Sequence, residues 1–250
     1  MIATEEFEGV TVATLDHGKV NAFDSDLMKA WISELDRLEQ SDTKALVLTG
    51  GGKVFSAGVD LRRLTEEGRD YVEMFLPLMS EAFLRTFTFS RPVVAAVNGH
   101  AIAGGCMLAC ACDYRVMSEG SGRIGTPELA VGVPFPSIAV EILRLMIPNH
   151  LLQTVIYRGV TCTPGDALTH GFVDEISPPD VLVERAIKMA VRLGSLPAAS
   201  FALTKRLIRE PSRERVVQYM QSIDKEILDA WMSPTVQAAI QRYVEETLKK

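Results

Sequence analysis

Two apolar runs without a charged residue constrain the fold most: ALVLT at residues 45–49 and PVVAAV at residues 92–97. Strands that are apolar on both faces are typical of a parallel sheet covered by helices on both sides. Apolar residues at helical spacing predict one helix over residues 26–40, before the first run, and another over residues 71–87, between the runs. This alternation predicts an α/β fold with a parallel sheet and right-handed crossovers.

Further strands are predicted near both runs. VTVATL at residues 10–15 alternates like a strand, and Asp16–Gly18 is a turn sequence, so the chain is expected to open with antiparallel strands. After the second run, the segment NGHAIAGG leads into an apolar helix around residues 106–112. YRVM at residues 114–117 is expected to be the next strand.

Beyond residue 136, few strands are expected and helices dominate. They are predicted over residues 164–170, 181–193, 213–231 and 234–248. We therefore divide the chain into an α/β core at residues 1–190 and a helical region at residues 191–250. Amphipathic helices must bury their apolar stripes against the core or another subunit, so we expect a homo-oligomer.

Composition and charge exclude several classes of protein. The 250 residues are 47% hydrophobic and carry 26 Lys and Arg against 32 Asp and Glu, a net charge of -6. This balance, without a long basic run, predicts no nucleic-acid partner. The acidic start MIATEEFEG does not resemble a signal peptide, and a cytoplasmic protein is expected.

Two further features argue against a membrane span and a metal site. Residues 93–112 carry no charge over a length that could span a bilayer, but Asn98–His100 and a glycine pair interrupt them, so no membrane partner is expected. The four cysteines lack the spacing of a zinc site and are interpreted as small core residues. No metal is predicted.

Two glycine-rich turns follow successive predicted strands and enter helices: FSAGVDL at residues 55–61 and HAIAGGC at residues 100–106. Such turns emerge together at the carboxyl ends of parallel strands. Unpaired N–H groups at two helix starts can donate to one oxygen, which stabilises an oxyanion or enolate. Ordinary strand-to-helix loops are the alternative interpretation.

Other glycine, serine and histidine patterns do not support a site. GGGKVF lacks the nucleotide-binding pattern GxxxxGK[ST], and no GxGxxG follows a predicted strand. Ser56 does not lie in GxSxG, and the four histidines form no pair with metal spacing. None of these residues is assigned to catalysis.

Glu128 is the carboxylate that most suggests catalysis. It lies in IGTPELAVGV, where apolar neighbours indicate burial, and burial raises the pKa of a carboxyl group and makes its carboxylate a stronger base. A glutamate after proline is also typical of a first helical turn. Asp60 is interpreted as a helix N-cap.

Three motifs, FSAGVDL, VNGHAIAGG and IGTPE, in this order and with these separations, resemble the crotonase, or enoyl-CoA hydratase/isomerase, superfamily. The resemblance covers nearly the whole chain. It implies a ββα spiral core with a C-terminal helical trimerisation region. It also implies a homotrimer or hexamer and an acyl-CoA substrate, with no cofactor beyond the CoA of that substrate.

The same resemblance implies roles for individual residues. The amides of Val59 and Gly104 would hold the thioester oxygen, and Glu128 would be the catalytic acid or base. The predicted substrate-binding residues are Ala57, Gly58, Val59, Asp60, Leu61, Gly104 and Met107. Arg62 or Arg63 would reach the CoA phosphates, unless both are solvated helix residues.

One departure from the family pattern indicates the reaction type. Enoyl-CoA hydratases typically have a second glutamate where this chain has Met107, and adding water usually needs two carboxylates. Moving a double bond needs one base and an oxyanion hole. AGGCMLACACDYRV followed by IGTPE is similar to Δ3,Δ2-enoyl-CoA isomerases. The alternatives are hydration, thioester hydrolysis, decarboxylation, or acyl-CoA binding without catalysis.

Overall fold

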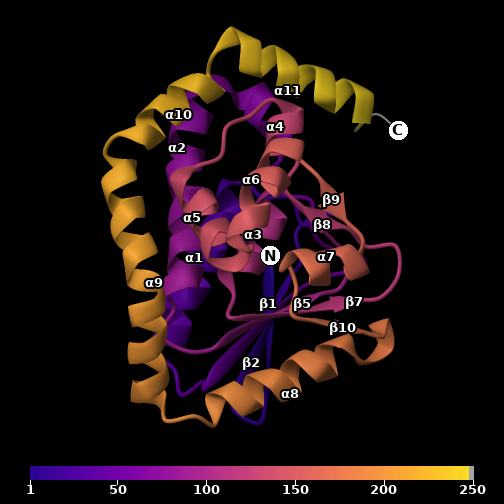
Figure 1. Ribbon diagram of the computed structural model, residues 1–250, viewed down its shortest axis with the longest axis vertical. Helices are drawn as coiled ribbons and strands as arrows, with labels where there is room; N and C mark the ends of the chain where they lie inside the picture. Colours follow the sequence, from indigo (N-terminus) through magenta and orange to yellow (C-terminus); the bar gives the residue numbers. More distant parts are fainter. Residues whose placement is uncertain (248–250) are drawn as a thin grey trace.

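The computed structural model describes residues 1–247 and contains two β-sheets (Figure 1). In spatial order, the larger sheet contains β1 (Ile2–Phe7), β2 (Val10–Leu15), β3 (Ala45–Gly50), β5 (Val93–Val97), β7 (Tyr114–Ser118) and β10 (Glu175–Ser177). Its strands pair in parallel, except β1 with β2. The two apolar runs form β3 and β5, and every residue of both strands is buried, as predicted.

The smaller sheet arises from a repeated step in the chain. It contains β4 (Val54–Ser56), β6 (His100–Ile102), β8 (Ile124–Gly125) and β9 (Thr161–Cys162). Three successive units each place one strand in the larger sheet, one in the smaller sheet, and then a helix. Those helices are α2 (Leu61–Thr88), α3 (Gly104–Ala111) and α4 (Glu128–Val131). This is the ββα spiral of the predicted fold.

The antiparallel opening is confirmed, but its predicted turn was wrong. β1 and β2 are joined through Glu8 and Gly9, both with positive φ, rather than through Asp16–Gly18. The Asp16–Gly18 segment instead leads towards α1 (Ser25–Glu39). The sequence TLDHG contains turn residues, so local pattern alone does not separate a hairpin from a strand-to-helix connection.

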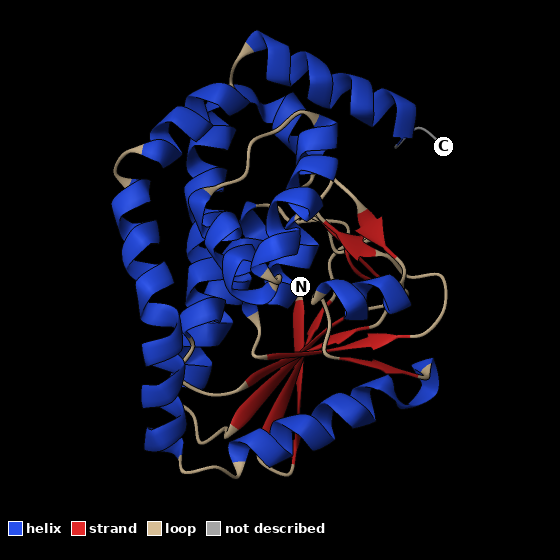
Figure 2. Cartoon of the chain, viewed as in Figure 1, coloured by secondary structure: helices blue, strands red, loops and turns tan. Residues whose placement is uncertain are grey.

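The central strands of the larger sheet are covered on both faces, as their sequences require, whereas the edge strand β1 is largely exposed (Figure 2). Alternate residues Leu46 and Leu48 of β3 face the main core, which also includes buried side chains of α1 and α2. Ala45 and Val47 face α8 (Leu182–Gly194) on the other side. The predicted boundary at residue 190 falls inside α8, which packs on the sheet.

Up to residue 247, the last that the structure describes, the C-terminal region contains three helices after α8. They are α9 (Ala198–Met220), α10 (Ile223–Trp231) and α11 (Pro234–Thr247). The prediction of one helix over residues 213–231 was wrong, because the chain leaves helical conformation at Ser222. The predicted helix end at residue 248 lies outside the described residues. In Figure 1, α9 runs down one side of the molecule, and α10 and α11 turn across its top.

The remaining helices connect the core with this C-terminal layer: α5 (Ser137–Met146), α6 (Asn149–Arg158), α7 (Pro164–His170) and a short 3-10 helix, η1 (Pro179–Val181). The uncharged stretch at residues 93–112 divides into β5, β6 and α3. No single helix among residues 1–247 is both long and apolar enough to cross a membrane. The pair Pro179–Gly194 and Ala198–Met220 reaches that length and composition only jointly, across a 102° bend.

Candidate active site

The first glycine-rich turn connects β4 to α2 and orients the backbone of Val59. Val59 forms an isolated parallel bridge with Phe23, in which Gly58 accepts from the Phe23 N–H at 2.7 Å and Asp60 donates to the Phe23 carbonyl at 2.9 Å. The Gly58 carbonyl and the Val59 N–H belong to one trans peptide group, in which C=O and N–H point in opposite directions. The N–H of Val59 therefore points away from Phe23.

Asn21 and Ser56 hold this first turn from behind. The Ser56 hydroxyl donates to the Asn21 carbonyl at 2.7 Å and accepts from the Gly58 N–H at 3.0 Å. The Asn21 amide in turn donates to the Val54 carbonyl at 2.9 Å. Both side chains are buried, so the turn has a fixed geometry before any ligand binds.

The second turn presents the start of α3. Gly104 is the first residue of that helix, so its N–H has no acceptor within the helix. The preceding residue, Ala103, has a φ of 51°, a left-handed conformation that is strained for a residue with a Cβ. Met107 donates its N–H to the Ala103 carbonyl at 3.0 Å, which starts the helical bonding.

The two turns lie against each other. Gly58 has a φ of +83°, and a Cβ added there would lie 2.7 Å from the carbonyl oxygen of Ile102 and 3.0 Å from the nitrogen of Gly104. Only glycine allows this approach. The contact brings the main chains of Val59 and Gly104 to one place, the arrangement in which two N–H groups can stabilise a single oxyanion.

A small apolar cavity of about 70 Å³ lies beside these turns. Six of the eight predicted site residues line it: Ala57, Val59, Leu61, Gly104, Met107 and Glu128. Gly58 and Asp60 are not among its described lining residues. Gly58 lies behind the wall, and the Asp60 carboxylate caps α2 by accepting from the N–H groups of Arg62 and Arg63 at 3.1 Å.

Glu128 is buried in this cavity, with 8% of its surface exposed. Its Oε2 has no hydrogen-bond partner among the described atoms. Burial raises the pKa of Glu128 from 4.5 to about 8, and its own backbone N–H lowers the pKa by a smaller amount. A carboxylate in this environment is a much stronger base than one in water, and its free oxygen is available to a substrate.

Met107 lies on α3 and lines the same cavity, with 1% of its surface exposed. A thioether is only a weak hydrogen-bond acceptor and cannot take up a proton near neutral pH. Among the described lining residues, Glu128 is the one carboxylate. The described lining therefore offers a single carboxyl group opposite a largely apolar surface.

Arg63 is occupied by acidic side chains in this structure. Its guanidinium donates to Asp24 at 2.9 Å and Asp26 at 2.8 Å, and it lies 5.1 Å from the centre of the Tyr71 ring. These contacts hold the start of α2 to the start of α1. A contact of Arg63 with CoA phosphates would compete with them, and that expectation stays a prediction.

The sequence patterns did not predict four large side chains of the wall that come from distant elements. Met79 and Phe83 come from α2, Trp231 from α10 and Tyr243 from α11. Trp231 ends an apolar stripe whose burial was predicted, but nothing local in the sequence indicates which surface it meets. The residues converge through packing between elements that are far apart in the chain.

Comparison with known proteins agrees with this geometry. Residues 5–249 match the family described as enoyl-CoA hydratase/isomerase. The chain belongs to the enoyl-CoA hydratase/isomerase family. The name of this family covers two reactions, hydration and isomerisation, so family membership alone does not identify the reaction.

The similar members of the enoyl-CoA hydratase/isomerase family include both isomerases and hydratases. Mouse mitochondrial enoyl-CoA delta isomerase 1 is 26% identical over 253 residues, covering 100% of this chain and 88% of the mouse protein. A putative enoyl-CoA hydratase from Thermus thermophilus is 32% identical over 212 residues, covering 83% of each protein. The crystal structure of human mitochondrial delta3-delta2-enoyl-CoA isomerase has the same fold, with a TM-score of 0.95. The two proteins are 24% identical, and the match covers 99% of this chain and 98% of the human chain.

Proposed function

We propose that this protein converts 3-enoyl-CoA into trans-2-enoyl-CoA, with Glu128 as the proton carrier. The observation that carries the proposal is the single carboxylate of the cavity, buried and with an unpartnered oxygen. It lies in an apolar cavity that the turns of Val59 and Gly104 also line. An isomerisation needs these groups and no second acid.

The proposed reaction moves one proton and returns it. The Glu128 carboxylate removes a proton from C2 of the 3-enoyl thioester, and electrons shift to the thioester oxygen to form a dienolate. The N–H groups of Val59 and Gly104 donate to that oxyanion. Protonated Glu128 then delivers the proton to C4, and the double bond forms between C2 and C3.

The apolar wall supports this proposal over hydration. Adding water requires a water molecule to be placed and activated beside the substrate, usually with the help of a second carboxylate. Met107 lies where a second carboxylate is typical of hydratases, and its thioether cannot act as a general base. The reaction uses no cofactor beyond the CoA of the substrate in this proposal.

Two substrates separate the candidate reactions. Purified protein is supplied with 3-hexenoyl-CoA, and the absorbance of the conjugated thioester product is followed. A parallel assay supplies crotonyl-CoA and measures 3-hydroxybutyryl-CoA. We expect the first reaction to be faster by at least about 100-fold, the size of one general acid–base contribution. Faster hydration would replace isomerase with hydratase as the function, and no turnover of any acyl-CoA would favour a binding protein.

We also propose that the chain acts as a homotrimer or hexamer. Leu203, Leu207 and Ile208 are exposed on α9, which leaves an apolar patch that none of the described residues covers. Sedimentation equilibrium tests the proposal, because a trimer or hexamer has three or six times the chain mass of 27.4 kDa. A monomer at micromolar concentration would contradict it.

A further inference from the structure

We propose that Trp231 is the residue that limits acyl-chain length, and that its removal joins the active-site cavity to a second apolar hollow. This inference rests on the proposed function, because it takes an acyl-CoA thioester as the ligand. It assigns a specificity role to a side chain of α10, far in sequence from the turns and from Glu128.

The second hollow lies between α2 and α10 and has a volume of about 120 Å³. Its wall is predominantly apolar and is formed by Leu76, Pro77, Ser80, Pro136, Met220, Asp224, Lys225, Ile227, Leu228 and Trp231. Trp231 and Pro136 also line the active-site cavity. The indole therefore belongs to the main core and borders an apolar space on each side.

The size of the active-site cavity indicates why this position matters. An apolar cavity of roughly 150 Å³ in another protein holds one benzene molecule. The cavity beside Glu128 has about 70 Å³, so it accommodates only a short acyl tail. A longer tail needs the space on the far side of Trp231, since the hollow between α2 and α10 is the adjoining apolar volume.

Trp231 is well placed to act as a stop. Its side chain is 3% exposed, and its indole N–H donates to the Pro134 carbonyl at 3.1 Å. This bond fixes the ring across the end of the cavity. Trp231 is also the last residue of α10, so its position depends on how that helix is held.

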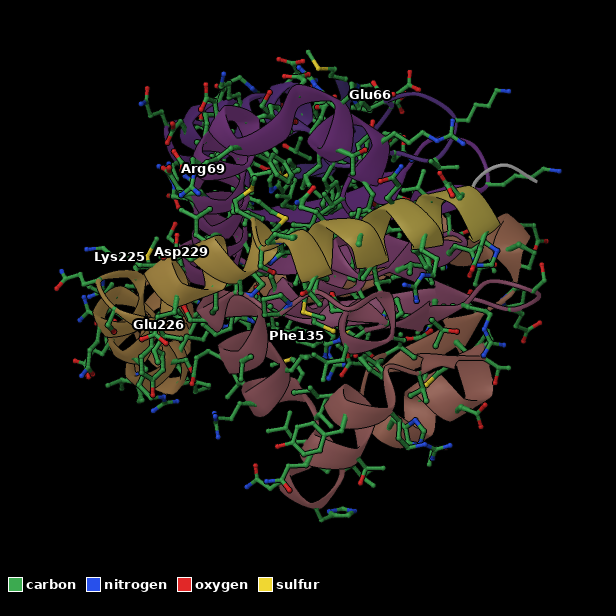
Figure 3. All side chains as sticks on the ribbon, turned by 90° about the horizontal axis from the view of Figure 1, so that it is seen from above. Glu66, Arg69, Phe135, Lys225, Glu226 and Asp229 are labelled. Carbon is green, nitrogen blue, oxygen red and sulfur yellow. The ribbon has the colours of Figure 1, made fainter. Side chains whose placement is uncertain are left out.

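Polar contacts join α10 to neighbouring elements near each of its ends. Asp224 accepts from the Ser137 N–H at 3.0 Å and from the Ser137 hydroxyl at 2.8 Å. Nearer its C-terminal end, Asp229 lies 3.5 Å from Arg69 of α2, and both side chains are exposed (Figure 3). The Ser137 contacts position α10 and therefore the indole, whereas the exposed Asp229–Arg69 pair contributes little.

The first experiment measures binding rather than turnover. Saturated acyl-CoA thioesters with even chains of 4 to 12 carbons are titrated into wild type and Trp231→Ala by calorimetry. We expect wild-type affinity to stop rising once the cavity is filled. In Trp231→Ala, the affinity for decanoyl-CoA relative to butanoyl-CoA should increase by at least about tenfold, because further methylenes are buried.

Two variants serve as controls for the ring and for tryptophan loss. Trp231→Phe keeps a large ring and should keep a chain-length profile near that of wild type. Trp31→Phe changes the second tryptophan, which lies in α1, donates to the Thr86 hydroxyl at 2.8 Å and lines neither space. It should leave the profile unchanged. A folded Trp231→Ala protein with the wild-type profile would overturn the inference.

A second measurement does not depend on the folding of Trp231→Ala. In Trp31→Phe, Trp231 is the remaining tryptophan of the chain. Its fluorescence, excited at a wavelength that spares CoA and tyrosine, should change with octanoyl-CoA or decanoyl-CoA and not with free CoA. Equal spectra for all ligands despite binding would overturn the inference.

The outcomes for the inference and for the proposed function are separate. Saturated thioesters have no double bond to move, so their binding is independent of isomerisation. Length-dependent binding that changes with Trp231, combined with no isomerase activity, would reject only the proposed reaction. Normal isomerase activity with no effect of Trp231 on chain length would reject only the inference. Failure of every thioester to bind would reject both.

Discussion

The core and the C-terminal helices contribute different kinds of groups to the same cavity. The core supplies the main chain of Val59 and Gly104 and the carboxyl group of Glu128. The C-terminal helices supply Trp231 and Tyr243, which are large side chains on the wall. The reacting groups are therefore fixed by backbone turns, whereas the shape of the substrate space depends on how separate helices dock.

This docking depends on a buried ion cluster between α9 and the core. The Lys205 ammonium lies 2.7 Å from Asp113, and Arg209 lies 2.9 Å from the same carboxylate. Arg209 also donates to the Ala111 carbonyl at 2.9 Å and lies 4.4 Å from the centre of the Phe87 ring. Burial lowers the pKa of Lys205 to about 8, although Asp113 opposes this shift.

The largest expected effect tests the contribution of the core to catalysis, by removing the carboxyl group of Glu128. Glu128→Gln keeps the size of the side chain but cannot carry the proton, so isomerase activity should fall by about 10³-fold or more. Steady-state rates with 3-hexenoyl-CoA measure the loss. Glu119→Gln changes an exposed carboxylate and should retain full activity. Normal turnover by Glu128→Gln would remove Glu128 from the mechanism.

Breaking the ion cluster should chiefly affect the C-terminal layer. Asp113→Asn leaves Lys205 and Arg209 buried without a carboxylate, which should destabilise the fold by about 3–5 kcal/mol. Urea unfolding monitored by circular dichroism measures the change. The control Glu210→Gln removes an exposed pair with Arg213 and should leave the unfolding midpoint unchanged. Similar midpoints for the two variants would show that the cluster does not anchor α9.

The pH dependence of turnover should report the core carboxyl group alone. Glu128 must be ionised to remove a proton, and its pKa in the free protein is raised to about 8. Below that pH, kcat/KM should decrease about tenfold per pH unit, and above it the value should level off. Rates measured from pH 6 to pH 9 test this. A flat profile would indicate another base.

The same group should affect stability with the opposite pH dependence. Below about pH 4.5, Glu128 is protonated in both the folded and unfolded chain. Between pH 4.5 and 8 the unfolded chain loses this proton while the folded protein keeps it, so the stability contribution decreases as pH rises. The free energy of unfolding of Glu128→Gln relative to wild type should therefore rise by about 4 kcal/mol from pH 5 to pH 9. If the free energies of unfolding of Glu128→Gln and wild type changed equally with pH, the raised pKa of Glu128 would be contradicted.

Sequence patterns predict the core better than the C-terminal layer for a physical reason. The runs of β3 and β5 are recognisable because both faces of these strands are buried. The caps of α1 and α2 are also local, since Asp24 and Asp60 bind N–H groups within three residues. Such features need no knowledge of distant contacts.

The C-terminal errors come from tertiary interactions. Pro211 lies inside α9, where it removes a backbone donor and would normally interrupt a helix. The buried contacts of Lys205 and Arg209 lie in the same helix and hold it against the core. Apolar residues continue at helical spacing across the break at Ser222, so the pattern does not show where α10 turns.

The candidate site also contains residues that the sequence predicts and residues that only tertiary packing places there. The glycine turns and Glu128 have recognisable local sequences, and the structure brings their residues to one cavity. Trp231 and Tyr243 reach that cavity only after two helices have folded back over the core. Their positions depend on docking angles, which residue spacing does not specify.

The α2 helix borders both apolar spaces and sets the distance between them. Phe83 and Met79 border the space beside Glu128, while Leu76 and Ser80 border the neighbouring hollow. Leu76 and Phe83 are seven residues apart, or roughly 10 Å along a helix. Backbone hydrogen bonds set this spacing, so the distance between the two spaces along α2 is fixed. Substitutions on α10 can therefore change the length of acyl chain that fits without changing that distance.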